Sequence, residues 1–156
     1  MTDLNLNDYP EIVLALSDPL TVKVLGTIGS AGEPRLAVKS SIRLAQNGVL
    51  TYDELIETSR TNANMVRALW FNHKVAVSLI APNARAWLLS GRPDQVLIAG
   101  RKFQERYQLV RQKNPESGLA AVWFIVIEDL EETTLTTRRA KEEAERPLLI
   151  HLDRLL

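Results

Sequence analysis

The sequence has no cysteine, only two histidines and no excess of charge of either sign. Without cysteine, the 156-residue chain can form no disulfide, thiolate nucleophile, iron–sulfur cluster or cysteine-ligated zinc site. Nineteen basic residues balance nineteen acidic ones, so no net positive field favours nucleic acid as a partner. His73 and His151 lie far apart without metal-ligand spacing, and we expect no metal site.

Long hydrophobic runs and familiar catalytic motifs are also missing. The longest apolar run, residues 119–127, is much shorter than the roughly 20 residues that span a bilayer. The N-terminus lacks the basic start and apolar stretch of a signal peptide, so we expect a cytoplasmic protein with no membrane partner. No G-x-S-x-G elbow is present, and residues 26–32 lack phosphate-loop spacing. A catalytic activity of this chain would therefore need a bound cofactor to supply the chemistry.

The apolar pattern predicts strands that are joined mostly by hairpins. Period-two alternation and β-branched residues predict six strands, at residues 21–28, 35–43, 49–52, 75–80, 85–91 and 119–127. Helical spacing predicts helices at 61–71 and 100–114, a short helix opened by Pro10, and a charged, helix-prone segment at 138–145 before an apolar tail at 148–156. This order indicates an α+β, mainly β, domain spanning residues 1–156, with a small antiparallel barrel, flanking helices and a C-terminal extension from about residue 136.

The segment before the helix at 61–71 carries the clearest chemical signal. Ser59 or Thr61 can cap this helix, which leaves backbone N–H groups of the first turn facing the preceding loop. Arg60 adds a fixed positive fork, and the two hydroxyl groups add donors. Together these groups predict a site for a phosphate monoester. A capped helix with an exposed arginine is the structural alternative.

Polar residues also cluster on the two strands before this helix. Lys39, Ser40 and Ser41 precede an Asn47-Gly48 turn, and residues 51–53 lie on the partner strand. A polar strand centre beside a phosphate site indicates a ligand that lies across the sheet. A solvent-facing Lys39 is the alternative.

The order of these segments resembles the pyridoxamine 5'-phosphate oxidase-like FMN-binding split barrels, and most nearly their small electron-transfer members. In that family a basic residue, a threonine and an asparagine at the helix start grip the flavin phosphate, and Arg60, Thr61 and Asn64 stand at these positions. Lysine is common where Arg60 stands. The resemblance covers about residues 10–134 and lies in the segments Pro34–Lys39, Gly48–Thr51, Ser59–Asn64, Val75–Val77, Leu89–Arg92 and Val122–Glu128.

The resemblance implies a six-stranded antiparallel split β-barrel, FMN as cofactor, and a homodimer with both flavin sites at its interface. The function it implies is that of an FMN-dependent oxidoreductase or electron carrier with a small-molecule or protein redox partner. No catalytic side chain is assigned, and the pyridoxal-phosphate-binding residues of the true oxidases are absent. With the polar pattern above, the expected cofactor-binding residues are Val38, Lys39, Ser40, Thr51, Asp53, Ser59, Arg60, Thr61 and Asn64.

Two other functions stay open on the sequence. The chain could be a non-catalytic module that stores or senses a flavin or another phosphorylated cofactor. The barrel could instead hold haem or the deazaflavin F420, and haem would need His73 or His151 as its axial ligand. The segment from Arg138 onward has no counterpart in the family, and could pack across the dimer or cover the flavin.

Overall fold

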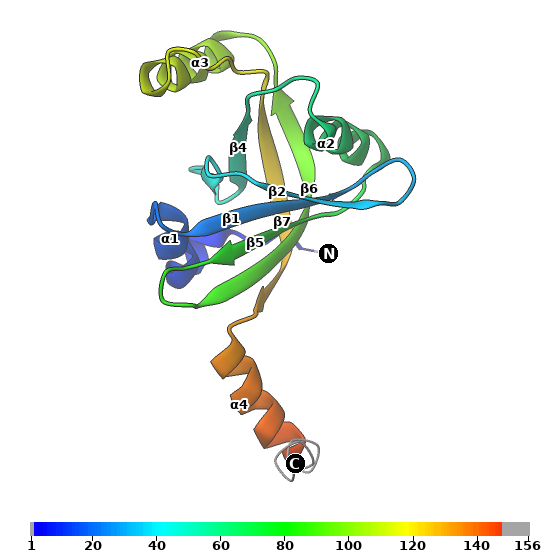
Figure 1. The fold of residues 1–156 in the computed structure, drawn as a ribbon, viewed down its shortest axis with the longest axis vertical. Coiled ribbons are helices and arrows are strands. Elements are labelled where there is room, and N and C mark those ends of the chain that lie inside the picture. Colours follow the sequence, from blue (N-terminus) through cyan, green and yellow to red (C-terminus); the bar gives the residue numbers. More distant parts are fainter. Residues whose placement is uncertain (1, 148–156) are drawn as a thin grey trace.

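One curled antiparallel sheet, flanked by helices, forms the body of the protein in the computed structural model, which describes residues 2–147 (Figure 1). The strands run in the spatial order β2-β1-β5-β6-β7-β4-β3. Their bounds are β1 Val22–Ile28, β2 Pro34–Val38, β3 Arg43–Leu44, β4 Leu50–Glu54, β5 Val75–Ile80, β6 Ala86–Leu97 and β7 Ala121–Glu132. The α+β class and the antiparallel barrel-like sheet are confirmed.

The helices begin and end close to the predicted positions. Pro10 opens the first α-helix, as its missing N–H allows, and Asn72 ends another in the left-handed conformation with φ 54°. The helices are a 3-10 turn Leu6–Asp8, α1 Pro10–Ser17, α2 Arg60–Phe71, α3 Arg101–Lys113 and α4 Leu135–Glu145.

The sheet has seven strands among the described residues instead of the predicted six. The predicted strand at 35–43 is wrong as a single strand, because it divides into β2 and β3. β2 pairs only with β1 and β3 only with β4, so the two pieces lie at opposite edges of the sheet. The chain crosses between these edges in residues 39–42, and this short crossing requires the sheet to curl until its edges approach. The alternation of apolar and polar residues in the sequence continues through residues 39–42, so it did not indicate that one strand ends and another begins there.

The core lies between the curled sheet and α1 and α2. The run predicted as a central strand forms most of β7, and Trp123, Ile125 and Ile127 are almost fully buried. α2 packs against β1 and β6, and Met65 is its fully buried contact. Trp123 Nε1 donates a hydrogen bond of 2.9 Å to Asn62 Oδ1. The first turn of α2 is therefore fixed to the middle of the sheet.

The other two long helices stand apart from this core. α3 lies beyond the ends of β4 and β6, α4 extends away from the opposite end of the molecule (Figure 1), and neither contains a buried residue. The apolar tail predicted at 148–156 lies outside the described residues. None of the helices within residues 2–147 has the length and apolar composition needed to cross a membrane.

Candidate functional site

The N-terminus of α2 combines a serine cap with an exposed arginine. Ser59 is the N-cap, and its Oγ accepts a hydrogen bond of 3.0 Å from the Asn62 backbone N–H. Arg60 is the first helical residue, and its side chain is exposed. The helix therefore presents a guanidinium group beside its positive dipole end, where an anion is favoured.

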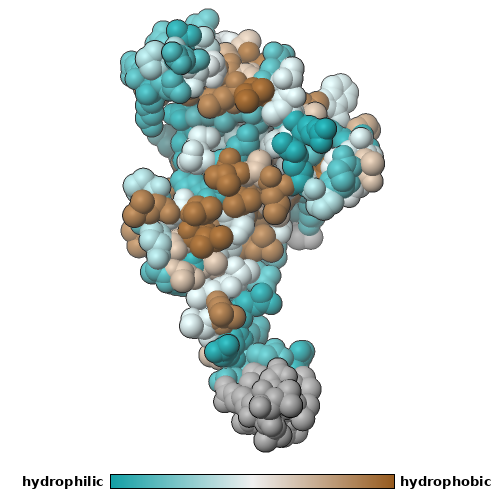
Figure 2. Space-filling view, in the orientation of Figure 1, coloured by the Kyte–Doolittle hydropathy of each residue, from teal (hydrophilic) through white to brown (hydrophobic). Residues whose placement is uncertain are grey.

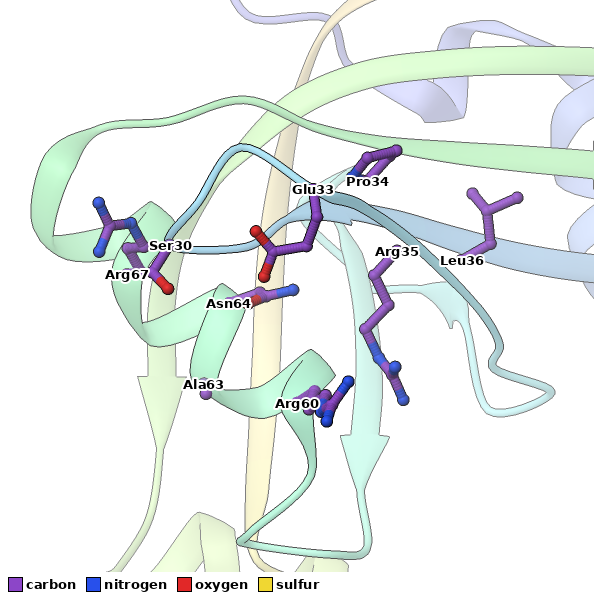
Figure 3. A pocket seen from close by; sticks show the side chains of 9 residues that line it. All are labelled: Ser30, Glu33, Pro34, Arg35, Leu36, Arg60, Ala63, Asn64 and Arg67. Atoms are coloured by element: carbon purple, nitrogen blue, oxygen red, sulfur yellow. The ribbon is translucent and has the colours of Figure 1, made fainter.

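A second arginine reaches this helix end from β2. Arg35 Nε donates a hydrogen bond of 3.2 Å to Oγ1 of Thr61, which is almost fully buried. This contact uses one of the five N–H donors of Arg35 and holds the guanidinium at the start of α2. Figure 3 shows the side chains of Arg35 and Arg60 close together at this end of the helix.

These side chains line a cavity of about 660 Å³ between the β1–β2 hairpin and α2, here called the arginine pocket (Figure 3). Asn64 also lines it, and its Nδ2 donates a 3.0 Å hydrogen bond to Thr27 Oγ1 on β1. The lining residues are Ser30, Glu33, Pro34, Arg35, Leu36, Arg60, Ala63, Asn64 and Arg67.

The arginine pocket carries an excess of positive charge. Arg35, Arg60 and Arg67 form no ion pair within residues 2–147, whereas Arg43, Arg85, Arg92 and Arg106 each contact a carboxylate. Glu33 is the one carboxylate among the lining residues. Three guanidinium groups against one carboxylate make this pocket suited to an anionic ligand.

A second cavity, of about 630 Å³, lies between α3 and the segment that crosses from β2 to β3, and is here called the α3 pocket. Aliphatic side chains such as Leu55 and Leu109 contribute to its wall. Four of the predicted site residues, Val38, Lys39, Ser40 and Asp53, line it.

Asp53 holds α3 to the sheet. Its side chain is 4% exposed, and Arg106 on α3 donates to both carboxylate oxygens, from Nε at 2.9 Å to Oδ1 and from Nη2 at 2.5 Å to Oδ2. Arg43 Nη1 adds a third donor at 3.2 Å. The carboxylate predicted to contact a cofactor is thus already bound on both oxygens by protein groups.

Lys39 and Lys23 organise the crossing segment. Lys39 Nζ lies 3.0 Å from Oε2 of the buried Glu54. Lys23 Nζ donates to the backbone carbonyls of Leu16 at 3.0 Å and Ile42 at 2.7 Å. Burial lowers the pKa of the Lys23 amine, and the Arg43 guanidinium lowers it further. These contacts tie residues 39–42 to β1 and β4.

The two faces of β4 carry different chemistry. Thr51 and Asp53 share one face, and Tyr52 and Glu54 share the other. The Oγ1 of Thr51 and the phenol of Tyr52 are buried without a hydrogen-bond partner among the described residues. Burial, together with the charge of Glu54, raises the pKa of the Tyr52 phenol, which therefore stays neutral. Neither Thr51 nor Tyr52 lines the arginine pocket or the α3 pocket.

The predicted site residues thus fall into three groups. Arg60 and Asn64 line the arginine pocket, with Ser59 and Thr61 beside them at the helix start. Val38, Lys39, Ser40 and Asp53 line the α3 pocket. Thr51 is buried in β4 and lines neither of the two pockets.

Sequence reasoning missed Arg35 and Arg67 in the arginine pocket and Arg106 in the α3 pocket. Arg67 follows Arg60 by seven residues and Asn64 by three, which is the spacing of one helix face, so helical periodicity carried that signal. Nothing local indicated Arg35 or Arg106, because each meets its partner across a long stretch of chain.

The structure describes one of the two histidines, His73. No group of three or more His, Cys, Asp or Glu residues among the described residues could hold a metal ion. His73 follows α2 at the helix end opposite Arg60, and its ring lies 5.9 Å from that of Phe71. His151 lies outside the described residues.

No family model matches this sequence, and no curated protein matches it. Solved structures do resemble it. HupZ of Group A Streptococcus superposes with a TM-score of 0.66 at 16% identity, covering 81% of this chain and 94% of HupZ. An FMN-binding protein from Syntrophomonas wolfei gives 0.62 at 15% identity, covering 83% and 86% of the two chains.

A protein provisionally named a pyridoxamine 5'-phosphate oxidase, from Lactobacillus delbrueckii, gives a TM-score of 0.57 at 21% identity, covering 84% of this chain and 99% of that one. At such identities the likeness concerns the fold. The sheet is curled, and its edge strands β2 and β3 do not pair with each other. This arrangement and the likeness to the solved structures confirm the expected barrel-like architecture. The chain has the split-barrel fold of the pyridoxamine 5'-phosphate oxidase-like proteins.

Proposed function

We propose that this chain binds a flavin nucleotide, FMN in the simplest case, with its phosphate at the start of α2. The observation that carries the proposal is the arginine pocket, where Arg35 and Arg60 meet at a helix N-terminus and neither forms an ion pair within residues 2–147. A phosphate accepts hydrogen bonds from both forks and from the free backbone N–H groups of the first turn. The hydroxyl of Ser59 still has its hydrogen to donate.

Three of the remaining predicted residues, Val38, Lys39 and Ser40, suit the ring and ribityl chain. Lys39 directly follows β2 and lies four residues after Arg35, which corresponds to about 13 Å of extended chain. Ser40 and the exposed side chain of Val38 lie at the same end of β2. The protein would hold the flavin across this strand, with its phosphate at one end and its ring at the other. A bound flavin ring would supply the chemistry, by accepting a hydride or electrons.

The similar structures support binding of a flavin, and they do not identify which flavin nucleotide this chain binds. One of them is described as an FMN-binding protein, and another is named as a pyridoxamine 5'-phosphate oxidase. On these grounds the expected activity is oxidoreduction or electron transfer.

The absorption spectrum of the purified protein tests the proposal. We expect flavin bands that bleach with dithionite or NAD(P)H, or, for colourless protein, fluorescence quenching of added FMN at one site per chain. Reduction without turnover of any partner would favour a storage or sensing module. A Soret band would indicate haem, and colourless protein that ignores FMN would contradict the flavin assignment.

We also propose that the chain forms a homodimer through the outer face of β1, β2 and β5. Strand register places Val22 opposite Ile80 and Gly26 opposite Leu36, so these residues share one face. Figure 2 shows apolar side chains gathered over these strands. The exposed fractions are large, at 75% for Leu36 and 70% for Val38. An apolar patch of this kind, rimmed by polar residues, is typical of a protein interface.

Changing Leu36 to glutamate should separate the dimer, because a buried unpaired carboxylate opposes association. Light scattering after size exclusion should give the mass of a dimer for the unchanged protein and of a monomer for Leu36→Glu. Leu135→Glu is the matched control, since Leu135 is 69% exposed on α4, away from the sheet face. A Leu36→Glu protein that keeps the dimer mass would contradict this interface.

A further inference from the structure

The α3 pocket adjoins the position proposed for the flavin ring. Val38, Lys39 and Ser40, which suit the ring and ribityl chain, line one side of this cavity. The other side comes from α3, through side chains that include Leu109 and Lys113. The cavity of about 630 Å³ is in the range of sites that hold small organic ligands. A ring held against the crossing segment therefore leaves the side toward α3 for a second molecule.

The α3 pocket presents apolar side chains that the protein leaves uncovered. Leu55 is 45% exposed, Ile56 61% and Leu109 49%, and all three line the cavity. α3 itself contains no buried residue, and Figure 2 shows apolar surface beside this helix. A ligand with an apolar body would remove these side chains from water, which is favourable in proportion to the area covered.

The charge of the α3 pocket favours an anion. The lining contains five cationic side chains and two carboxylates. Both carboxylates already contact cations, since Asp53 is bound by Arg43 and Arg106, and Glu54 is bound by Lys39. A cationic ligand would have to displace one of these partners, whereas an anionic ligand would displace none of them.

Lys113 is the lining cation that has no partner within residues 2–147. It is the last residue of α3, and its side chain is exposed. The Lys23 amine, in contrast, donates to two backbone carbonyls. Ser117 lines the same cavity and carries a hydroxyl donor. The acid group of a ligand can therefore pair with Lys113 at the exposed edge of the pocket.

We infer that the α3 pocket binds the substrate of the proposed flavoprotein, and that this substrate is an organic carboxylate with an apolar body. The inference rests on the proposed flavin function and names the class of molecule which that function serves. Lys113 binds the acid group, and Leu109 contacts the apolar body. Asp53 is a positioning residue, because its contact with Arg106 holds α3 beside the cavity.

Three naphthalene probes that share one apolar body and differ in charge test this inference. They are the anionic 2-naphthoate, the neutral 2-naphthamide and the cationic 2-naphthylmethylammonium. Calorimetry on the purified protein, with and without added FMN, measures each affinity. We expect 2-naphthoate to bind about tenfold more tightly than 2-naphthamide, and the cation to bind most weakly. In the FMN-loaded protein, 2-naphthoate should also shift the flavin absorption bands, because the ring adjoins the cavity.

Two lysines of the same helix provide a matched pair of variants. Lys113→Gln should weaken the binding of 2-naphthoate about fivefold to tenfold and leave that of 2-naphthamide unchanged. Lys102→Gln should change neither, since Lys102 is an exposed residue of α3 that does not line the cavity. Leu109→Asn should weaken both probes severalfold, because it removes part of the apolar wall.

The possible outcomes separate this inference from the flavin proposal. Equal affinities for 2-naphthoate and 2-naphthamide, or a preference that survives Lys113→Gln, would overturn the carboxylate assignment. Flavin bands that stay unchanged at saturating 2-naphthoate would overturn the placement beside the ring. If Leu109→Asn instead converts a dimer into a monomer, a second copy covers the pocket and the inference fails. Lys113-dependent binding of 2-naphthoate by a protein that takes up no FMN would support the ligand class and contradict the flavin function.

Discussion

Replacement of Arg60 by alanine should weaken FMN binding by about tenfold to a hundredfold. A charge-assisted hydrogen bond contributes about 1.5–3 kcal/mol, and Arg60 presents its fork at the open end of α2, where the helix dipole also favours an anion. Titration of the apoprotein with FMN, followed by flavin fluorescence, measures the effect.

Matched variants separate the contribution of the bidentate Arg60 guanidinium from that of its positive charge alone. Arg60→Lys keeps the charge and loses the bidentate geometry, so its FMN affinity should lie between those of the unchanged protein and Arg60→Ala. Arg35→Ala should lower the affinity as well, because it removes the second guanidinium and the contact to Thr61. Arg139→Ala provides the surface control. Unchanged FMN affinity in Arg60→Ala would exclude the phosphate assignment.

Asp53→Ala should be the most destabilising of the substitutions considered for the predicted site residues. The buried carboxylate binds Arg106 through two oxygens and Arg43 through one, and its loss would leave two partly buried cations without their anion. The guanidinium groups keep side-chain exposures of 23% and 31%, so water compensates in part, and we expect a cost of about 2–3 kcal/mol. For a chain of this size, the Tm should fall by roughly 4–10 °C.

A double-mutant cycle with Arg106→Ala identifies the source of this loss. The coupling energy should be favourable and on the order of 1 kcal/mol or more, since the two side chains touch. Limited proteolysis should then cut near α3, which has no buried residue to hold it. If Asp53→Ala instead keeps its Tm and loses FMN affinity, Asp53 contacts the cofactor, as the sequence alone suggested.

The division of one predicted strand shows where local patterns fail. Residues 35–43 alternate as a strand should, yet β2 and β3 lie at opposite edges of the sheet. The alternation of apolar and polar residues indicates only which side chains share a face of a strand. It does not indicate with which other strand each piece pairs. The Lys23 ammonium, bound to the Ile42 carbonyl, stabilises the crossing through a contact between residues far apart in sequence.

The sequence by itself determined the helix at 61–71, the two candidate caps Ser59 and Thr61, the arginine at its start and the chain order of the strands around it, because capping and periodicity act within a few residues. Only the tertiary structure decided which charges meet. The curl of the sheet brings Arg35 to Thr61 and Arg106 to Asp53. It thereby neutralises Asp53, while Arg60 and Arg67 form no ion pair within residues 2–147. Such pairings depend on strand register and curvature, which join residues that no local pattern connects.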